Sequence, residues 1–423
     1  MQEPASRIEV DLAAVAHNVG VIRRVLGTGR GGRPPAALCA VLKADGYGLG
    51  AARLARRLAT LGVEMLAVYT PEQARGLVEA AISIPMLVLM PVRELERSDV
   101  LYRAASRGRL HLSIHDRDNL QGVGEIADRQ GITIPVHVEV DTGMSRGGVE
   151  PGEAAQLIAR IDRHARLRLA GVFTHFNSAD ADERLTRHQS ETFERFLRDV
   201  EPLIPEDCLI HQANTFAMFR EAGLHRDMVR VGLGLLGFGA EEFADPDEFT
   251  LRHEAAELRP CMRWMSRVVH LKTIEAGKPV GYGATWTAPR ISRIALVPVG
   301  YADGYPLALS NKGSVAIELP DGERAFAPIV GRVSMDQITV DVTDLPASAV
   351  GVGTSVEVVG QDPAAPNHLP TLARQAGTIT HELLCRLSHR VPRVSMNVES
   401  GDSATGIEEG RPAPVAVATT RAR

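Results

Sequence analysis

Strand-length apolar runs recur through the first 231 residues, and all but the last precede a stretch that can form a helix. The runs are 36–42, 64–69, 84–89, 109–114, 134–140, 167–173, 206–211 and 226–231. Alternating strands and helices indicate a parallel sheet, because parallel neighbours need a crossover connection that a helix usually supplies. Eight such runs over this length favour a (β/α)8 barrel of the TIM type over an open, doubly wound sheet.

The pattern changes after about residue 241. Residues 241–258 are acidic and interrupted by proline, as is typical of a linker. Short β-type runs without long helices follow from 259 to about 359, and a short helical stretch lies near 369–387. The sequence therefore predicts a barrel domain over residues 1–255, a β-rich C-terminal domain over 256–398 and a disordered tail over 399–423.

Composition argues against several classes of partner. The net charge is −5, the basic residues are scattered and aromatic residues make up 4%, so we expect neither nucleic acid nor a membrane surface as a partner. The four cysteines form no CxxC pair, and Cys385 stands where a zinc-binding H-E-x-x-H motif at 381–385 would need its second histidine. We therefore expect reduced cysteines and no metal. The sequence has neither a signal-peptide pattern nor an apolar run of membrane-spanning length, which predicts a cytoplasmic protein.

Polar side chains gather where the predicted barrel strands end. Lys43 follows the first strand, 139–146 the fifth, 174–177 the sixth, 211–215 the seventh, and 230–232 the eighth. The carboxyl ends of the strands form the active-site rim in barrels of this type. We therefore expect these five groups to converge on one rim.

Lys43 is the residue on this rim with the clearest chemistry. A lysine at the end of a buried strand is poorly solvated, which disfavours the ammonium form and lowers the pKa of the amine. Such an amine is nucleophilic and can form a Schiff base with a carbonyl group. The alternative is a lysine that marks the strand end and extends its ammonium group into water.

The segment 232–237 matches G-x-G-x-x-G, but poor helix formers follow it, which argues against a dinucleotide site. We interpret these glycines as backbone amides that can bind a phosphate after the last barrel strand. Arg230 ends that strand, where it can pair with a carboxylate or donate a charged hydrogen bond to a ligand. A lysine for a Schiff base, glycines for a phosphate and an arginine for a ring nitrogen together suggest pyridoxal phosphate.

Two glycine-rich loops of the predicted C-terminal domain contain three of the six tyrosines. Tyr282 lies in the loop 280–286, and Tyr301 and Tyr305 lie in the loop 299–306. Such loops need no function beyond turning the chain. Alternatively, the small neighbouring residues let a ligand approach closely, so that a phenol can transfer a proton.

These segments resemble the alanine racemase family, in its form with a barrel and a β domain. The matching motifs are AVLKADGYGLG, VDTGMSRGG, FTHF, VRVGLGLLGFG, VGYGATWT, VGYADGYP, VGRVSMDQ and RVPR, which occur in the family order between about Ile8 and Arg393. The resemblance implies a pyridoxal-phosphate-dependent isomerase that interconverts L-alanine and D-alanine for cell-wall precursor synthesis.

The resemblance also implies roles for individual residues. Lys43 corresponds to the lysine that carries the cofactor and moves the proton on the D face. Tyr282 corresponds to the base for the opposite face, supplied by a partner subunit, which implies a homodimer with shared active sites. Two residues match partners of the cofactor ring, namely His175 and Arg230. The phosphate site is matched by Tyr47, Thr215, Gly232 and Leu233. The substrate pocket and its entrance are matched by Arg146, Tyr301 and Met335.

Three positions depart from the family pattern. Glu139 stands where a lysine, carbamylated in some members, is common, and His389 stands where a phosphate-contacting tyrosine is common. Thr215 replaces the more usual serine and keeps the hydroxyl group. Because glutamate is an anion on a shorter stem than a carbamate, we expect Glu139 to orient Arg146, directly or through water.

Three other functions fit the same residues. One is a broad-specificity or serine-preferring racemase, because sequence does not give the volume of the pocket. Another is a fold-related decarboxylase, which the two tyrosine loops disfavour. The third is a non-catalytic pyridoxal-phosphate-binding protein, which resembles the barrel alone and would not need Tyr282.

Overall fold

The computed structural model describes residues 4–27, 34–239, 252–320 and 322–398, and it confirms the predicted barrel. Eight parallel strands form one sheet in the order β8-β7-β6-β5-β4-β3-β2-β9. They are β2 (Ala37–Val41), β3 (Met65–Val68), β4 (Met86–Val88), β5 (Leu110–Ile114), β6 (Ile134–Glu139), β7 (Leu167–Phe173), β8 (Leu209–His211) and β9 (Met228–Val231). The end strands also meet, because the amide of Asp227 donates to the carbonyl of Ile210 and that of Arg230 to Ala213, both at 2.9 Å.

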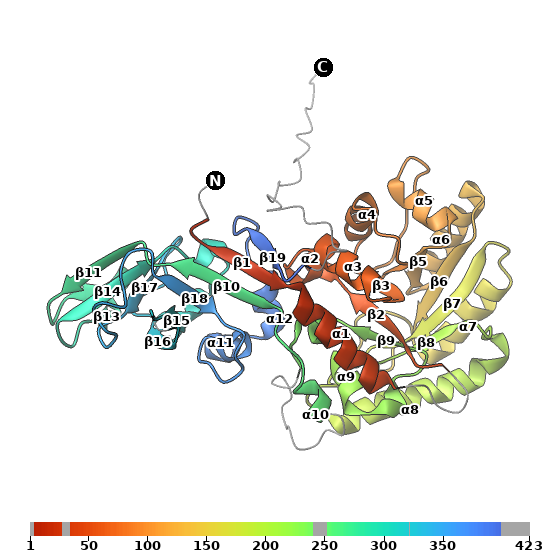
Figure 1. The fold of residues 1–423 in the computed structure, drawn as a ribbon. Helices are drawn as coiled ribbons and strands as arrows, with labels where there is room; N and C mark the ends of the chain where they lie inside the picture. Colours follow the sequence, from red (N-terminus) through yellow and green to blue (C-terminus); the bar gives the residue numbers. More distant parts are fainter. Residues whose placement is uncertain (1–3, 28–33, 240–251, 321, 399–423) are drawn as a thin grey trace.

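Helices surround the barrel, as the alternation predicts (Figure 1). They are α1 (Leu12–Leu26), α2 (Lys43–Tyr47), α3 (Ala51–Thr60), α4 (Pro71–Glu79), α5 (Val100–Ser106), α6 (Arg117–Gln130), α7 (Pro151–Asp162), α8 (Glu183–Val200), α9 (Thr215–Arg220) and α10 (Arg252–Ala255). Six of them begin at a capping side chain that accepts backbone N–H groups of the first turn, namely Asp11, Thr70, Asp99, Asp116, Asp182 and Asn214. None of the described helices combines the length and apolar character that a membrane crossing requires.

The C-terminal domain is rich in β structure, also as predicted. One sheet has six strands in the order β16-β15-β18-β10-β1-β19, a second has β11-β14-β17, and β12 and β13 form a hairpin. The strands are β1 (Arg7–Asp11), β10 (Met262–Arg267), β11 (His270–Ile274), β12 (Pro279–Val280), β13 (Trp286–Thr287), β14 (Ser292–Val297), β15 (Ser314–Glu318), β16 (Arg324–Pro328), β17 (Ile338–Asp341), β18 (Ser355–Val359) and β19 (Arg393–Met396). The helices α11 (Leu369–Ala376) and α12 (Thr380–Cys385) occupy the expected helical stretch.

The strand β1 corrects one part of the expected domain division. The sequence predicts a barrel domain over residues 1–255, but β1 lies in the C-terminal sheet, antiparallel to β10 and parallel to β19. Ile8 and Val10 are fully buried there, so the apolar alternation of this strand serves the second domain. The chain enters the barrel at α1 (Figure 1). Most of the proposed linker and the whole tail, 240–251 and 399–423, lie outside the described residues, so the remaining boundaries stay predictions.

We predict that truncation of Ile8 destabilises the protein although it lies far from the barrel interior. Ile8→Ala removes a fully buried side chain from a strand with two partners, which should lower the free energy of unfolding by about 2–5 kcal/mol. The denaturation midpoint in urea measures the effect. Ile291→Ala, at a side chain that is 67% exposed, is the matched control and should change the midpoint little. Equal midpoints for the two variants would contradict a stabilising role of β1.

Candidate active site

Lys43 lies at the carboxyl end of β2, at the start of an unusual turn. Ala44, Asp45, Gly46 and Tyr47 have φ angles of 52°, 54°, 62° and 58°, so four consecutive residues are left-handed. Three of them are not glycine, and each costs about 1–2 kcal/mol in this conformation. Such strain persists only where the surroundings hold it, and it is common at functional sites.

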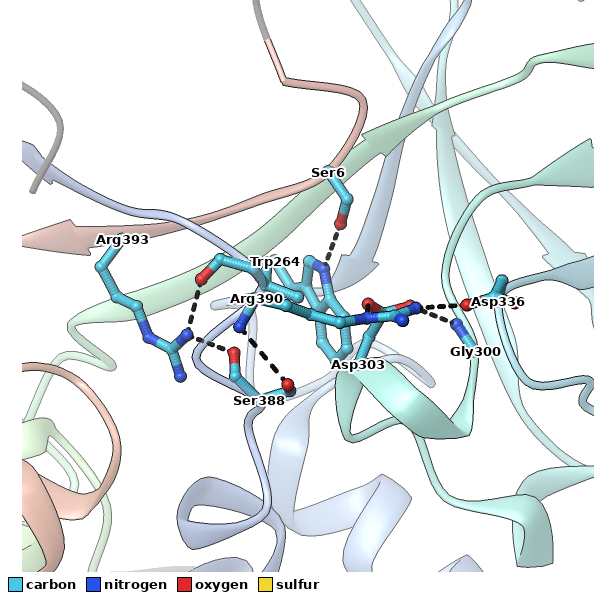
Figure 2. A network of polar contacts seen from close by, with 9 residues as sticks. Ser6, Trp264, Gly300, Asp303, Asp336, Ser388, Arg390 and Arg393 are labelled. Atoms are coloured by element: carbon cyan, nitrogen blue, oxygen red, sulfur yellow. Dashed lines mark hydrogen bonds and ion pairs between the residues drawn. The ribbon is translucent and has the colours of Figure 1, made fainter. Parts of the chain in front are cut away.

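Hydrogen bonds from both domains hold this turn. The carboxylate of Asp45 accepts the amide of Ala51 at 2.8 Å, which joins the turn to α3. Arg393 of the C-terminal domain donates from Nε to the carbonyl of Gly48 at 2.9 Å and from Nη2 to the carbonyl of Leu387 at 2.9 Å. Figure 2 shows Arg393 beside the loop that contains Ser388. The position of Lys43 therefore depends on both domains.

The environment of Lys43 favours its neutral amine. The side chain opens to the barrel mouth, but the surrounding protein removes enough water to lower the pKa of Lys43 by desolvation. The positive charges of Arg146 and Arg230 lower this pKa further. The direction agrees with the expectation for a nucleophilic lysine.

Arg230 lies on β9, the strand paired with β2, and is almost fully buried, with 4% of its surface exposed. Its Nη1 donates to Nδ1 of His211 at 2.8 Å, and its Nη2 donates to the carbonyl of Thr174 at 2.8 Å and to Nδ1 of His175 at 3.2 Å. Burial lowers the pKa of Arg230 to about 10, so the guanidinium is still charged at neutral pH. Burial and the charge of Arg230 lower the pKa of His175 to about 3, which keeps that imidazole neutral.

The four residues expected at a phosphate site lie around the ends of β2 and β9. The hydroxyl of Thr215 accepts the amides of Gly232 and Gly234, both at 3.3 Å. A Cβ atom on Gly232 would lie 2.1 Å from the hydroxyl of Tyr47, so a larger residue would displace this phenol. Leu233 begins the short 3-10 helix η3 (Leu233–Leu236), and among the described residues its amide donates to no protein acceptor.

The expected direct contact between Glu139 and Arg146 is absent between these two described side chains. Glu139 instead pairs with Nδ1 of His115 at 3.1 Å, and Nε2 of His115 donates to the carbonyl of Leu89 at 2.8 Å. The pairing follows from position, because Glu139 ends β6 with its side chain turned into the barrel wall, whereas Arg146 is exposed on the following loop. Arg146 acts on the site electrostatically, because its positive charge lowers the pKa of Lys43.

The C-terminal domain presents its three predicted site residues to solvent. Tyr282, Tyr301 and Met335 are 71%, 46% and 54% exposed. The amide of Tyr301 donates to the carbonyl of Ser334 and that of Ala302 to Met335, both at 3.0 Å, so the structure brings Tyr301 and Met335 together. A cavity of about 390 Å³ opens beside Tyr301.

A network of ion pairs fixes the loops that carry Tyr301 and Met335 (Figure 2). Arg390 donates from Nε to Asp303 and from Nη2 to Asp336, both at 2.6 Å. Asp303 also accepts the amide of Gly300 at 2.8 Å and ends the short helix η7 (Tyr301–Asp303). One arginine therefore joins both loops to the segment that precedes β19.

Tyr282 is not brought to Lys43 within the chain. It lies in the 3-10 helix η6 (Tyr282–Ala284), two residues before β13, and β13 is at the end of the C-terminal domain remote from the barrel (Figure 1). A single copy therefore contains the lysine and the tyrosine at separate places.

Two neighbours of Lys43 were missed as site residues. Burial and the charge of Lys43 lower the pKa of His381, whereas burial raises the pKa of Cys385 against the opposing effect of the Lys43 charge. Both side chains therefore lie near the Lys43 amine. The ring of His381 is also 6.0 Å from that of Tyr47. The sequence offered only an incomplete zinc motif at these positions, and the described residues contain no group of His, Cys, Asp and Glu side chains that could hold a metal. His389 is exposed on the loop that follows α12.

The lowered pKa of Lys43 predicts selective chemical labelling. A larger fraction of neutral amine should let Lys43 react faster with an amine reagent than the exposed Lys272, in protein dialysed free of small molecules near neutral pH. Mass spectrometry of peptides after brief labelling measures both rates. Slower labelling of Lys43 than of Lys272 would contradict the prediction.

Two family models together match nearly all of the described chain. The model described as the N-terminal domain of alanine racemase matches residues 10–239. The model described as the C-terminal domain of alanine racemase matches residues 261–395.

Relatives and solved structures agree with these matches. The chain is 34% identical to an alanine racemase of Halothermothrix orenii over 396 residues, which cover 93% of this chain and 97% of the relative. It is 36% identical to an alanine racemase of Cutibacterium acnes, with 91% and 96% covered. The structure of alanine racemase from the D-cycloserine producer Streptomyces lavendulae superposes with a TM-score of 0.82 at 28% identity, covering 96% of this chain and 100% of that one. The structure from Bartonella henselae, with covalently bound pyridoxal phosphate, gives a TM-score of 0.75 at 26% identity, with 93% and 100% covered.

Proposed function

This chain belongs to the alanine racemase family, and on that premise we propose that it interconverts L-alanine and D-alanine with Lys43 and Tyr282 as its two bases. As a member of the family it is an isomerase. The observation that carries the assignment of Lys43 is its place at the end of β2 in the barrel mouth, where desolvation and two cations lower its pKa. The assignment of Tyr282 rests on the family.

The residues of the barrel mouth fit pyridoxal phosphate. The amine of Lys43 would hold the cofactor covalently, and Arg230 would donate a hydrogen bond to the ring nitrogen. His175 would lie beside the ring, since it accepts a hydrogen bond from Arg230. The hydroxyl groups of Tyr47 and Thr215, the backbone of Gly232 and the unused amide of Leu233 would bind the phosphate. The absence of a side chain at residue 232 supports this fit, because it keeps the Tyr47 hydroxyl in place.

The bound cofactor supplies an electron sink that stabilises negative charge at the substrate Cα. Racemisation then requires a proton to leave one face of Cα and another to arrive on the opposite face, so one base must stand on each side. Lys43 Nζ would move the proton on the D face and Tyr282 Oη that on the L face. Arg146, exposed on the rim beside Lys43, would bind the substrate carboxylate.

The position of Tyr282 makes a homodimer part of this proposal. Tyr282 is 71% exposed and remote from Lys43 in its own chain, so a second copy would have to supply it. Tyr301, Met335 and Leu307 are also large and largely exposed on the same domain, and such surfaces commonly mark protein interfaces. Tyr301 and Met335 would then stand at the entrance to the partner's pocket.

The cellular role follows from the reaction. D-alanine made by a cytoplasmic enzyme of this family would feed peptidoglycan precursor synthesis. The assignment to the cytoplasm rests on the sequence and on the family.

The first prediction is a single main product. Purified protein with added pyridoxal phosphate and a panel of L-amino acids should yield D-alanine from L-alanine, measured by chiral chromatography. Several D products would indicate a broad-specificity or serine-preferring racemase. No D product from a protein that carries the cofactor on Lys43 would contradict racemisation and favour a carrier or decarboxylase.

The second prediction separates the two bases and tests the dimer. Lys43→Ala and Tyr282→Phe should each lower kcat by at least about 100-fold, because each removes one proton-transferring group. A mixture of the two variants, dissociated and reassociated, should recover about a quarter of wild-type activity, since one site of each hybrid dimer receives both bases. Either variant mixed with itself is the control. No recovery in hybrids that have formed would contradict shared sites.

A further inference from the structure

Three histidines in the barrel interior form a continuous hydrogen-bonded chain that ends on Arg230. Nδ1 of His111 lies 2.9 Å from Nε2 of His137, and Nδ1 of His137 lies 2.9 Å from Nε2 of His211. Nδ1 of His211 accepts the hydrogen bond of Arg230 at 2.8 Å. The chain starts near the exposed turn at Gly108, whose backbone also forms a hydrogen bond with His111. It therefore runs from the amino-terminal end of the barrel to the site.

The barrel wall is shaped around this chain. His137 and His211 come from β6 and β8, and their contact crosses the intervening strand β7. Gly171 of β7 makes the crossing possible, since a Cβ atom there would lie 2.1 Å from Nδ1 of His137. The register between β6 and β7 also shifts between Val136 and His137. The missing side chain at Gly171 and the register shift both make room for the imidazole of His137. They indicate that the backbone of β6 and β7 is adapted to the histidine chain.

Arg230 fixes the direction of every hydrogen bond in the chain. A guanidinium can only donate, so Nδ1 of His211 must accept and its proton must lie on Nε2. Nε2–H of His211 then donates to Nδ1 of His137, whose own Nε2–H donates to Nδ1 of His111. All three imidazoles are therefore neutral Nε2–H tautomers, because a second proton on any of them would remove an acceptor that the chain requires. Their dipoles all point the negative end toward Arg230.

The orientation of the imidazoles bears on the energetic cost of burying Arg230. Arg230 is a buried cation, and no carboxylate lies within ion-pair distance of it among the described residues. Isolated charges are costly in a protein interior unless dipoles or counter-ions replace the lost water. The neighbouring titratable and charged groups, Cys39, Glu139, Arg146 and Arg168, act on the chain or on Arg230 only across space. The groups in contact with the guanidinium are His211 and His175, the carbonyls of Thr174 and Gln212, and the ring of Phe173, whose centroid is 5.2 Å from Cζ. Of these, His211 is the one that continues into the chain of aligned imidazoles.

We propose that His137 and His111 are positioning residues that act through His211 to stabilise the Arg230 cation and fix the orientation of its guanidinium. In terms of the proposed function, on which this part rests, they hold Arg230 as a pure donor toward the cofactor ring nitrogen. The chain is not a proton relay, because its inner end is an arginine that is already charged and has no site for another proton. Burial supports this assignment, since it lowers the pKa of His111 to about 4 and the pKa values of His137 and His211 well below the ordinary range.

Nitrogen NMR of the holoenzyme with labelled histidine tests the chain directly and needs no catalysis. His111→Gln, His137→Gln and His211→Gln assign the three signals by their loss. We expect three neutral Nε2–H tautomers that stay neutral as the pH falls below about 6.5, the ordinary value for histidine. An Nδ1–H tautomer or a doubly protonated imidazole at any of the three positions would overturn the proposal.

The effect of the histidine chain on Arg230 is tested by the ratio of pyruvate formation to alanine racemisation in variants of the chain. His137→Leu leaves His211 without an acceptor, so we expect kcat for alanine racemisation to fall about tenfold with little change in KM. We also expect more of the competing transamination, in which the amino group of alanine passes to the aldehyde carbon of the cofactor and pyruvate is released, so the pyruvate formed per racemisation should rise. Gly171→Ala should shift both quantities in the same direction by displacing the imidazole, while keeping all three histidines.

His225→Leu is the matched control. His225 is also a buried histidine, 6% exposed, and its Nε2 bonds to the carbonyl of Met218, away from the chain. It should leave the pyruvate ratio unchanged even where it lowers stability. An unchanged ratio in folded His137→Leu would overturn the positioning role. If the wild-type enzyme formed no D-alanine, the proposed function would fail, while the tautomer measurement would still decide the structure of the chain.

Discussion

The position of Lys43 depends on the hydrogen bond that Arg393 donates to the carbonyl of Gly48. The preceding residues 44–47 are all left-handed, a conformation that an isolated peptide would leave at once. Arg393 begins β19, and β19 is paired with β1, so the second domain supplies the restraint that the barrel strand alone does not. The turn that carries Lys43 is therefore held jointly by both domains.

The barrel could be predicted because its strands are buried on both faces and read as unbroken apolar runs of the right length. The membership of β1 could not be predicted in the same way. Ile8 and Val10 alternate with polar residues as in any half-buried strand, and nothing local specifies which sheet they complete. Pairing with β10 and β19 is decided by distant segments that fold against it.

The same distinction applies to the site. Lys43 and Arg230 could be found because the ends of parallel strands meet on one rim, whatever the details of packing. The partner of Glu139 could not be predicted, since His115 at the end of the neighbouring strand β5 and Arg146 on the loop after β6 are both candidates, and the fold brings His115 within 3.1 Å. The hydrogen-bonded chain of His111, His137 and His211 could not be predicted from the sequence either. A histidine inside an apolar run reads as an isolated polar residue, and Gly171 reads as a flexible one until His137 is seen beside it.

The place of β1 between β10 and β19 has a consequence for synthesis on the ribosome. Ile8 is opposite Trp264 on one side and Arg393 on the other, so β1 must wait for two segments that are made much later than itself. Before β10 is made β1 has two unpaired edges, and one edge stays unpaired until β19 is made, so other chains could engage it. The barrel strands precede both segments, but the turn that carries Lys43 gains its restraint from Arg393 only after β19 has been made. The nascent chain would therefore hold Lys43 in its native position only from that point.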